Sequence, residues 1–347
     1  MTLFIPIGII IAAGLTMLSS ISEKLFFSQS TWIAIGALLI PLFQLFRRQG
    51  FLRSKWFSWG VYSAGVLLLT LAYFFAPVIR NTRSWLVVGP FQFQPVELVK
   101  MGLILVFASY FAKRHVAIAR PKHLAASFFI FGIPAFFTLL QPDLGSATVL
   151  FGIWFGFLLV SGLPRRWVIA FFMLLAIGAL LGWSIFLEDY HRERILGVVY
   201  PERDALGVNY STIQSKIAIG SGGVWGKGYG QGTQTQLGFL TEPGTDFIFS
   251  GLVEEWGFLG GVVVLGAFLA LEFYILRRAL AARGNFEKFL CLGTAIMFGI
   301  HFFVNVGSAT GIVPVIGITF PFLSYGGSSL MANAALVAMI YALEEHA

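Results

Sequence analysis

The chain has 347 residues, of which 57% are hydrophobic and only 11% are charged. Apolar runs of about twenty residues recur from one end to the other, which is typical of a protein that crosses a membrane several times. The net charge of +7 is also typical of nucleic-acid-binding proteins, but its distribution along the chain excludes that class, as shown below. The single cysteine, Cys291, excludes a disulfide framework and a cysteine-based zinc site.

Ten apolar segments are each long enough to cross about 30 Å of hydrocarbon as a helix. We expect these spans at residues 3–20, 30–46, 57–78, 95–112, 124–140, 145–162, 167–187, 247–276, 287–306 and 325–342. The first span has no basic segment before it and no good cleavage site after it, so we interpret it as a retained helix. The sequence therefore predicts an all-α polytopic membrane protein with ten transmembrane helices in a single domain, residues 1–347.

Basic residues mark one side of this predicted bundle. Fourteen of the 23 Lys and Arg residues lie in the connections that follow the second, fourth, sixth and eighth spans, which all fall on the same side. Because positive residues collect on the cytoplasmic side, both termini are expected inside. Acidic residues lie in or beside the opposite loops: Glu23, Asp143, Glu188, Asp189, Glu193, Glu202, Asp204, Glu242 and Asp246. The basic charge therefore indicates membrane topology and not nucleic-acid binding.

The outer side carries most of the unusual sequence. The longest connection, residues 188–246, separates the seventh and eighth spans, and connections of that length are generally functional or disordered. Its glycines allow positive φ and a close approach to a ligand. Because the loop also carries aromatic and apolar residues, we expect ordered structure lying on the membrane. The glycines are at positions 220, 222, 223, 226, 228, 230, 232, 238 and 244. A second irregular stretch, residues 305–329, should frame a cavity with it, because irregular backbone at membrane depth needs shielding.

The glycine-rich loop matches neither common nucleotide motif. Lys227 follows Gly226, but Gly228 stands where the phosphate-loop pattern requires Ser or Thr. The dinucleotide pattern fails as well, because Thr233 occupies its third glycine position after Gly228 and Gly230. A nucleotide site is therefore not supported.

Several ionisable or polar residues lie within the spans or at their outer ends. Glu97 and Lys100 share one helical face, either as a local ion pair or as a functional pair that faces a cavity. Asp143 is expected to cap the helix that follows it. His301 and Asn305, four residues apart, are expected to make interhelical hydrogen bonds and not to bind a ligand.

Asp246 precedes the eighth span and has two interpretations. It could cap that helix, or it could act as a general base or metal ligand at the outer mouth of the cavity. On a helix that begins here, Glu254 would lie about 12 Å deeper and Glu255 would face the opposite side. These three carboxylates would then form no single cluster, and only Asp246 would be placed for chemistry at the surface.

Six motifs, in order and over nearly the whole chain, resemble the SEDS family (shape, elongation, division and sporulation). They are residues 81–86 (NTRSWL), 94–100 (QPVELVK), 141–145 (QPDLG), 214–223 (QSKIAIGSGG), 245–249 (TDFIF) and 321–328 (PFLSYGGS). Residues 228–240 (GYGQGTQTQLGFL) are similar to the RodA branch, which acts in elongation, and less so to the FtsW branch, which acts in division.

The resemblance implies a peptidoglycan glycosyltransferase in the bacterial cytoplasmic membrane. Such an enzyme polymerises lipid II into glycan strands at the outer face during cell elongation. A class B penicillin-binding protein, a transpeptidase, is its expected protein partner. Membrane lipids are expected to contact the chain as well, and no nucleic-acid partner is expected. The family's essential aspartate maps onto Asp246, and its glutamate and lysine map onto Glu97 and Lys100.

The chain departs from the family pattern at three places. Val96 stands where serine is usual, and Gly244 stands where a histidine often precedes the Thr-Asp pair. In the family, arginine often directly precedes the tryptophan; here Ser84 stands in that position, and the arginine is one residue earlier, at Arg83. These differences weaken any role for the missing histidine, but they leave the aspartate, glutamate and lysine assignments intact.

The expected chemistry joins an acceptor 4-hydroxyl to a donor sugar that carries a lipid pyrophosphate. Asp246 would remove the proton, and cationic groups would stabilise the leaving group. The expected substrate-binding residues are Arg83, Lys216, Lys227, Gln236 and Ser324, with Lys100 as a further cation. The sequence does not identify a cofactor. A divalent cation, Mg²⁺ or Mn²⁺, is possible, but it would need several oxygen ligands, whereas the sequence offers isolated carboxylates.

Three alternatives remain open from the sequence. A flippase or transporter of the same lipid-linked precursor would carry charges in the middle of broken spans, whereas here charge is concentrated at the outer mouth. An FtsW-like division paralogue would share the chemistry. A scaffold that only recruits another enzyme would not depend on Asp246 for chemistry.

Overall fold

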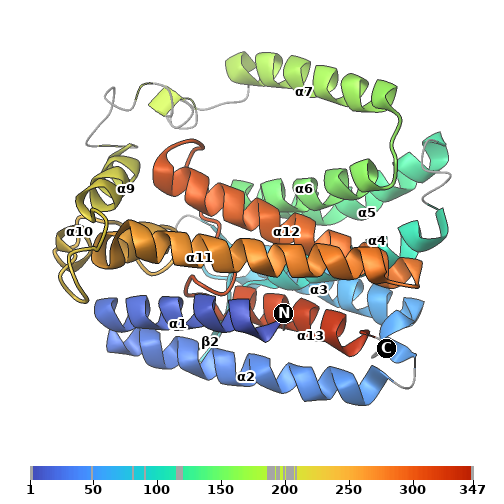
Figure 1. Cartoon of the computed structure of the whole chain (residues 1–347). Helices are drawn as coiled ribbons and strands as arrows, with labels where there is room; N and C mark the ends of the chain where they lie inside the picture. Colours follow the sequence, from blue (N-terminus) through green and yellow to red (C-terminus); the bar gives the residue numbers. More distant parts are fainter. Residues whose placement is uncertain are drawn as a thin grey trace.

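The protein is an elongated bundle of helices (Figure 1). The structure, a computed structural model, describes residues 3–47, 50–79, 82–89, 91–114, 120–185 and 209–344, and the single positions 192, 196, 197, 200 and 207. Most of the first half of the predicted outer loop, residues 188–208, lies outside the described residues.

Each predicted span overlaps one helix. The helices are α1 (Phe4–Ile21), α2 (Glu23–Arg47), α3 (Lys55–Phe75), α4 (Pro95–Arg114), α5 (Pro121–Leu140), α6 (Leu144–Val160), α7 (Arg165–Ile185), α9 (Tyr210–Ser221), α10 (Thr233–Gln236), α11 (Ile248–Ala281), α12 (Asn285–Thr310) and α13 (Gly327–Ala342), with a 3-10 turn η1 (Phe51–Arg53). Among the described residues, α1 to α5, α11 and α12 are long and apolar enough to cross a membrane, and α6 and α13 are shorter apolar helices. The fold is therefore that of a multi-pass helical membrane protein.

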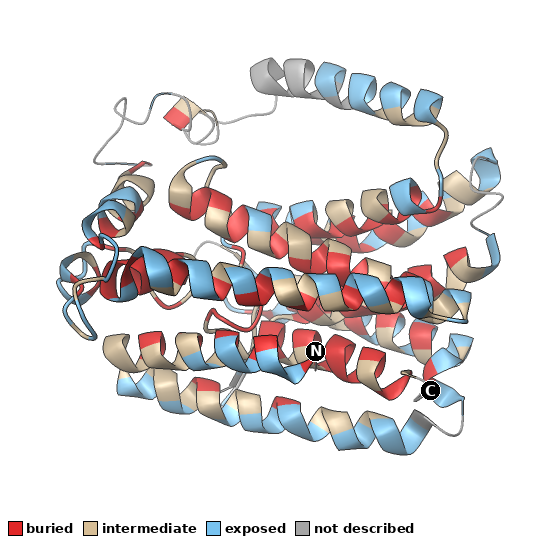
Figure 2. Cartoon of the chain, in the orientation of Figure 1, coloured by how far each residue is buried: buried red, intermediate tan, exposed pale blue. Residues whose placement is uncertain are grey.

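Helix α4 is the centre of the bundle. In its most apolar 18-residue window 78% of the residues are buried, compared with 11% in α2. Figure 2 shows much of α2 as exposed or intermediate, and the large apolar side chains that it exposes suit a lipid environment. Close packing depends on glycine, because a Cβ on Gly102 of α4 would lie 2.7 Å from the Cα of Tyr62 in α3.

The fold is mostly helical, as expected, but it also contains one short β-hairpin that the sequence did not indicate. Strand β1 (Leu86–Val88) pairs antiparallel with β2 (Phe91–Phe93), with Leu86 opposite Phe93. Gly89 at the turn has a φ of 60°, which glycine adopts without strain. The hairpin delivers the chain directly to Pro95, the first residue of α4, where proline's fixed φ suits a helix start.

Helix α11 is broken at Gly257, so the prediction of one continuous span here is wrong. Gly257 has φ 73° and ψ −175°, which are not helical values. A Cβ on Gly261 would lie 2.9 Å from Val253 and 3.6 Å from Phe249, although a straight helix separates Val253 from Gly261 by about 12 Å. The first part of α11, residues 248–256, therefore folds back toward the part that follows the break.

The irregular stretch near the C-terminus is shorter than predicted. Helix α12 continues to Thr310 and α13 begins at Gly327, so the irregular residues are 311–326 and not 305–329. Gly311 ends α12 in the left-handed conformation, with φ 78°, as glycine commonly does after a helix. We call residues 311–326 the outer strap, after the side of the membrane on which the sequence predicts them to lie.

Candidate active site

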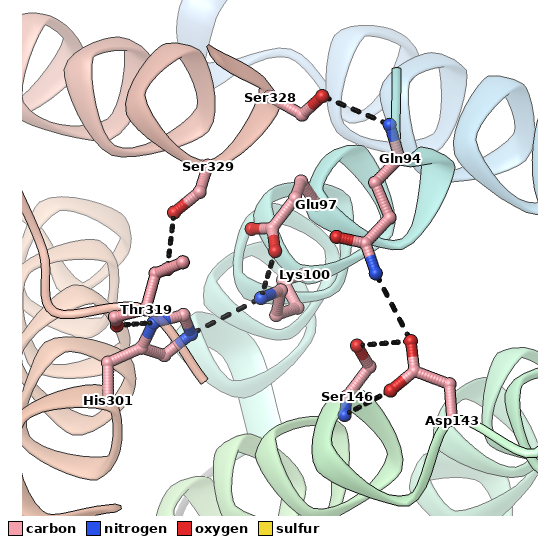
Figure 3. Close-up of polar contacts among 9 residues, drawn as sticks. All are labelled: Gln94, Glu97, Lys100, Asp143, Ser146, His301, Thr319, Ser328 and Ser329. Atoms are coloured by element: carbon pink, nitrogen blue, oxygen red, sulfur yellow. Dashed lines mark hydrogen bonds and ion pairs between the residues drawn. The ribbon is translucent and has the colours of Figure 1, made fainter. Parts of the chain in front are cut away.

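Glu97 and Lys100 form a buried ion pair in the first turns of α4. The Lys100 Nζ lies 2.7 Å from Glu97 Oε1, and the two residues are 1% and 5% exposed, respectively. Their predicted position on one helical face is therefore confirmed, in the form of a direct contact. Lys100 Nζ also lies 3.2 Å from Nε2 of His301 on α12 (Figure 3).

His301 connects this ion pair to the outer strap. Its Nδ1 lies 3.0 Å from the carbonyl oxygen of Thr319. Because a carbonyl only accepts, we assign the proton to Nδ1, which leaves the lone pair on Nε2 to accept from the Lys100 ammonium. Thr319 Oγ1 in turn lies 3.0 Å from Ser329 Oγ on α13. The network thus joins α4, α12, the strap and α13.

Asp246 lies just before α11 and is half-buried. The helix begins at Ile248 with Phe247 as its N-cap, so Asp246 precedes the capping position, and the capping interpretation is wrong. The backbone carbonyl of Asp246 accepts a hydrogen bond of 3.1 Å from Asn305 Nδ2. A Cβ on Gly317 would lie 3.9 Å from Asp246 Oδ2, so the carboxylate lies beside the strap.

Three consecutive strap residues lie beside Asp246 or bond to Asn305 and His301, the residues that contact Asp246 and Lys100. Gly317 lies beside the Asp246 carboxylate. The next carbonyl, of Ile318, accepts a 2.8 Å hydrogen bond from Asn305. The carbonyl after it, of Thr319, contacts His301. The predicted interhelical bond is confirmed for His301, which contacts Lys100 of α4, whereas Asn305 bonds to backbone carbonyls outside the helices. The strap therefore runs between Asp246 and the Glu97–Lys100 pair.

Ser324 fixes the strap to the residue before Asp246. Its hydroxyl donates to the carbonyl of Thr245 at 2.7 Å and accepts from the backbone N–H of Phe320 at 2.9 Å. The side chain is 4% exposed, so it is a buried clasp in this structure. Tyr325 N–H adds a bond of 2.8 Å to the carbonyl of Gly244.

Lys227 and Gln236 belong to a second network, which is organised by two buried carboxylates of α11. Glu254 accepts from Lys227 Nζ at 2.7 Å, and also from the hydroxyl and backbone N–H groups of α10. Glu255 accepts from Gln236 Nε2 at 3.0 Å and from Ser20 Oγ at 2.6 Å. Both glutamates therefore hold the glycine-rich loop, a role that the sequence did not reveal.

The same loop lies directly against the break in α11. The N–H groups of Lys227 and Gly228 donate to the carbonyls of Glu254 and Glu255, each at 3.0 Å. A Cβ on Gly257 would lie 2.3 Å from the backbone nitrogen of Gly226. Glycine is required here by backbone contact as well as by positive φ.

The remaining predicted substrate residues lie at the surface. Arg83 is exposed, in the segment that precedes β1. Lys216 is exposed on α9, and a Cβ on Gly311 would lie 2.5 Å from its Nζ. Its ammonium therefore lies at the C-terminal end of α12, where the helix dipole favours a cation.

Asp143 caps α6, as predicted. It accepts from the backbone N–H of Ser146 at 2.9 Å and from the Ser146 hydroxyl at 2.8 Å. Gln94 Nε2 adds a bond of 3.2 Å, and the backbone N–H of Gln94 donates to Ser328 Oγ on α13 (Figure 3). Within the described part of the chain, no three His, Cys, Asp or Glu side chains are grouped closely enough to hold a metal ion.

Known proteins are similar to this chain in sequence and in fold. Residues 1–347 match the FtsW/RodA/SpoVE family model, described as a cell cycle protein. The chain is 35% identical over 286 residues to the peptidoglycan glycosyltransferase MrdB of Escherichia coli K12, which covers 82% of this chain and 77% of that protein. It is 34% identical over 322 residues to stage V sporulation protein E of Bacillus subtilis 168, covering 89% and 84%.

Two solved structures resemble the whole bundle. One belongs to a peptidoglycan synthase complex described as coordinating polymerization and crosslinking, with a TM-score of 0.84, 33% identity and coverage of 98% of this chain and 96% of that chain. The other is the rod shape determining protein RodA of Thermus thermophilus, with a TM-score of 0.72, 32% identity and coverage of 98% and 94%. The chain therefore belongs to the FtsW/RodA/SpoVE family.

Proposed function

We propose that this chain is a peptidoglycan glycosyltransferase that polymerises lipid II into glycan strands at the outer face of the bacterial cytoplasmic membrane. The name of the Escherichia coli relative and the description of the synthase complex support the reaction class. The observation that carries the proposal is the placement of Asp246, whose backbone is held by Asn305 while its carboxylate lies beside Gly317 of the outer strap.

In this reaction Asp246 acts as the general base. The acceptor 4-hydroxyl transfers its proton to the carboxylate as its oxygen bonds to the anomeric carbon of the donor. The bond from that carbon to the lipid pyrophosphate breaks, and the departing phosphate keeps the electron pair. A positioned base contributes roughly 10²- to 10⁴-fold to such a rate.

Cationic side chains stabilise the departing pyrophosphate. Arg83 and Lys216 are exposed, and they are the first candidates for this role. Lys100 is 1% exposed and bonded to Glu97 and His301, so direct contact with phosphate requires the side chains that cover it to move. Lys227 is held by Glu254, and in this structure it supports the loop.

The assay that tests the function uses purified protein in detergent or liposomes with labelled lipid II and no other polymerase. Polymer of increasing length is the expected product, and Asp246→Asn should form it far more slowly. A flippase would instead move labelled lipid between leaflets without forming polymer. A scaffold would give neither product, nor any dependence on Asp246.

The RodA-like branch is proposed from residues 228–240, since the relatives include proteins of several branches. Expression in a strain that has lost its own elongation polymerase should restore rod shape. Expression in a strain that lacks its division polymerase should not restore septation. Rescue of division alone would assign the chain to the FtsW-like branch.

The proposed topology has ten spans with both termini in the cytoplasm. Ten helices at the predicted positions and the one-sided basic loops support it. Single cysteines at the exposed Trp225 and Trp56 test it. In intact cells an impermeant maleimide should label position 225 and leave position 56 unlabelled, whereas the reverse pattern would invert the topology.

A class B penicillin-binding protein is the proposed partner. The related synthase complex couples polymerization to crosslinking, and this sequence contains no Ser-x-x-Lys motif of a transpeptidase. The two proteins should co-purify from membranes in mild detergent. Separate elution, with polymerisation unaffected by the partner, would refute the pairing.

A further inference from the structure

His301 lies in the middle of a buried polar network that the proton transfer at Asp246 does not use. It is 1% exposed, and so is Lys100. Within the described chain, Glu97 Oε2 is a buried oxygen without a hydrogen-bond partner. A polar cluster of this kind is costly inside a bundle that spans a membrane, so its arrangement calls for a reason beyond packing.

We propose that His301 is a positioning residue that couples Lys100 to the outer strap and, through the strap, to Asp246. The inference rests on the proposed function, since the coupling serves a polymerase whose proton acceptor is Asp246. His301 contacts neither the carboxylate nor the reacting atoms. It acts by fixing the positions of Lys100 and, through the strap, of Asp246.

The first half of the coupling is the bond between His301 and Lys100. The ammonium has two acceptors in the described structure, Glu97 Oε1 at 2.7 Å and His301 Nε2 at 3.2 Å. A neutral imidazole is required, because a proton on Nε2 would face the ammonium without an acceptor. His301 therefore holds Lys100 in one position only while its Nδ1 proton is directed elsewhere.

The second half is the grip of α12 on the strap. His301 and Asn305 are one helical turn apart, and they bind the adjacent carbonyls of Thr319 and Ile318. Asn305 uses the same amide group to bind the Asp246 carbonyl. A shift of Thr319 therefore moves the neighbouring part of the strap, where Gly317 lies beside the Asp246 carboxylate.

The alternative is that His301 only fills space in the core. Two substitutions separate these interpretations. His301→Gln keeps an acceptor for Lys100 and a donor for Thr319, because its amide carries both groups. His301→Leu keeps an apolar volume but removes both. Met297→Leu, one turn away on α12 and also buried, is the matched packing control.

The experiment measures initial rates of lipid II polymerisation by the purified full chain at several lipid II concentrations, together with melting in detergent. For His301→Leu we expect kcat to fall roughly tenfold to a hundredfold with KM nearly unchanged, as for a misplaced reacting group. His301→Gln should retain a kcat close to that of the wild type, and Met297→Leu should resemble the wild type. Equal loss in His301→Gln and His301→Leu, or wild-type kcat in His301→Leu, would overturn the proposal.

A second measurement does not depend on the reaction. Melting of Lys100→Met, His301→Leu and the double variant forms a mutant cycle for the contact. Coupled residues should give a double variant whose melting temperature falls by less than the sum of the two single shifts. Additive shifts would refute the coupling. If the shifts are not additive but the wild-type chain makes no polymer, only the proposed function is refuted.

Discussion

Asn305 donates to the backbone carbonyl of Asp246 at 3.1 Å and to that of Ile318 at 2.8 Å, both from the same Nδ2 group. One buried amide therefore fastens the start of α11 to the outer strap, although 59 residues separate Asn305 from Asp246. The position of the Asp246 carboxylate depends on a contact between segments that are distant in the sequence. A substitution at Asn305 should consequently lower the reaction rate by moving Asp246, although Asn305 itself does not take part in the reaction.

Replacing Asn305 with leucine tests this dependence. Asn305→Leu leaves two carbonyls without their donor, so we expect a stability loss of about 1–3 kcal/mol. The polymerisation rate should fall roughly tenfold to a hundredfold, since a small misplacement of a reacting group is enough for that. Ser308→Ala, which removes only a local bond within α12, is the control. An unchanged rate in Asn305→Leu would show that Asp246 is held by other means.

The Glu97–Lys100 pair needs a variant that removes both charges. Lys100→Met alone leaves a buried carboxylate, and breaking a buried pair in this way costs about 3–5 kcal/mol, so a loss of activity would be ambiguous. The double variant Glu97→Gln with Lys100→Met avoids that charge. If the pair is functional, this double variant should remain folded and lose polymerisation.

The control for that experiment is the Arg53–Glu287 pair, whose arginine side chain is 50% exposed. The glutamate side chain is 14% exposed, so the pair is only partly exposed. A partly exposed pair contributes less to stability than a buried one, so Arg53→Gln with Glu287→Gln should stay folded and polymerise at the wild-type rate. Normal polymerisation by the buried double variant would reduce Glu97 and Lys100 to a structural salt bridge.

Local patterns predicted much of this fold. Apolar length alone located the helices, because a segment that crosses lipid must satisfy its backbone within itself. The spacing of Glu97 and Lys100 correctly placed them on one face, and the residues around Asp143 correctly indicated a helix cap. Each of these features depends on residues within one or two helical turns.

The features that were missed depend on contacts between distant segments. Lys100 and His301 are 201 residues apart, so no local pattern could pair them. Gly257 lies in an apolar run that is typical of a continuous helix. The break there is revealed by the folded structure, in which the backbone of Gly226 packs against Gly257. The buried role of Glu254 follows from the same fold of the loop.

Gly257→Ala tests the break in α11. The residue has a φ of 73°, and an added Cβ would lie 2.3 Å from the backbone nitrogen of Gly226. Strain of this kind costs of order 1–3 kcal/mol, so we expect a lower melting temperature and weaker polymerisation. Gly266→Ala, on the same helix with open space around the added Cβ, should match the wild type. Equal behaviour of the two variants would mean that the break is not needed.

Asp246→Asn is the decisive substitution for the chemistry. Helix α11 has Phe247 at its N-cap, so a change at Asp246 does not remove the capping residue. Asparagine keeps the size of the side chain but cannot accept the proton of the acceptor hydroxyl, and we expect a rate loss of roughly 10²- to 10⁴-fold. Melting in detergent should stay close to that of the wild type. Glu23→Gln, which neutralises an exposed carboxylate at the start of α2, is the isosteric control and should polymerise normally. An Asp246→Asn protein that polymerises lipid II at the wild-type rate would end the assignment of Asp246 as the base.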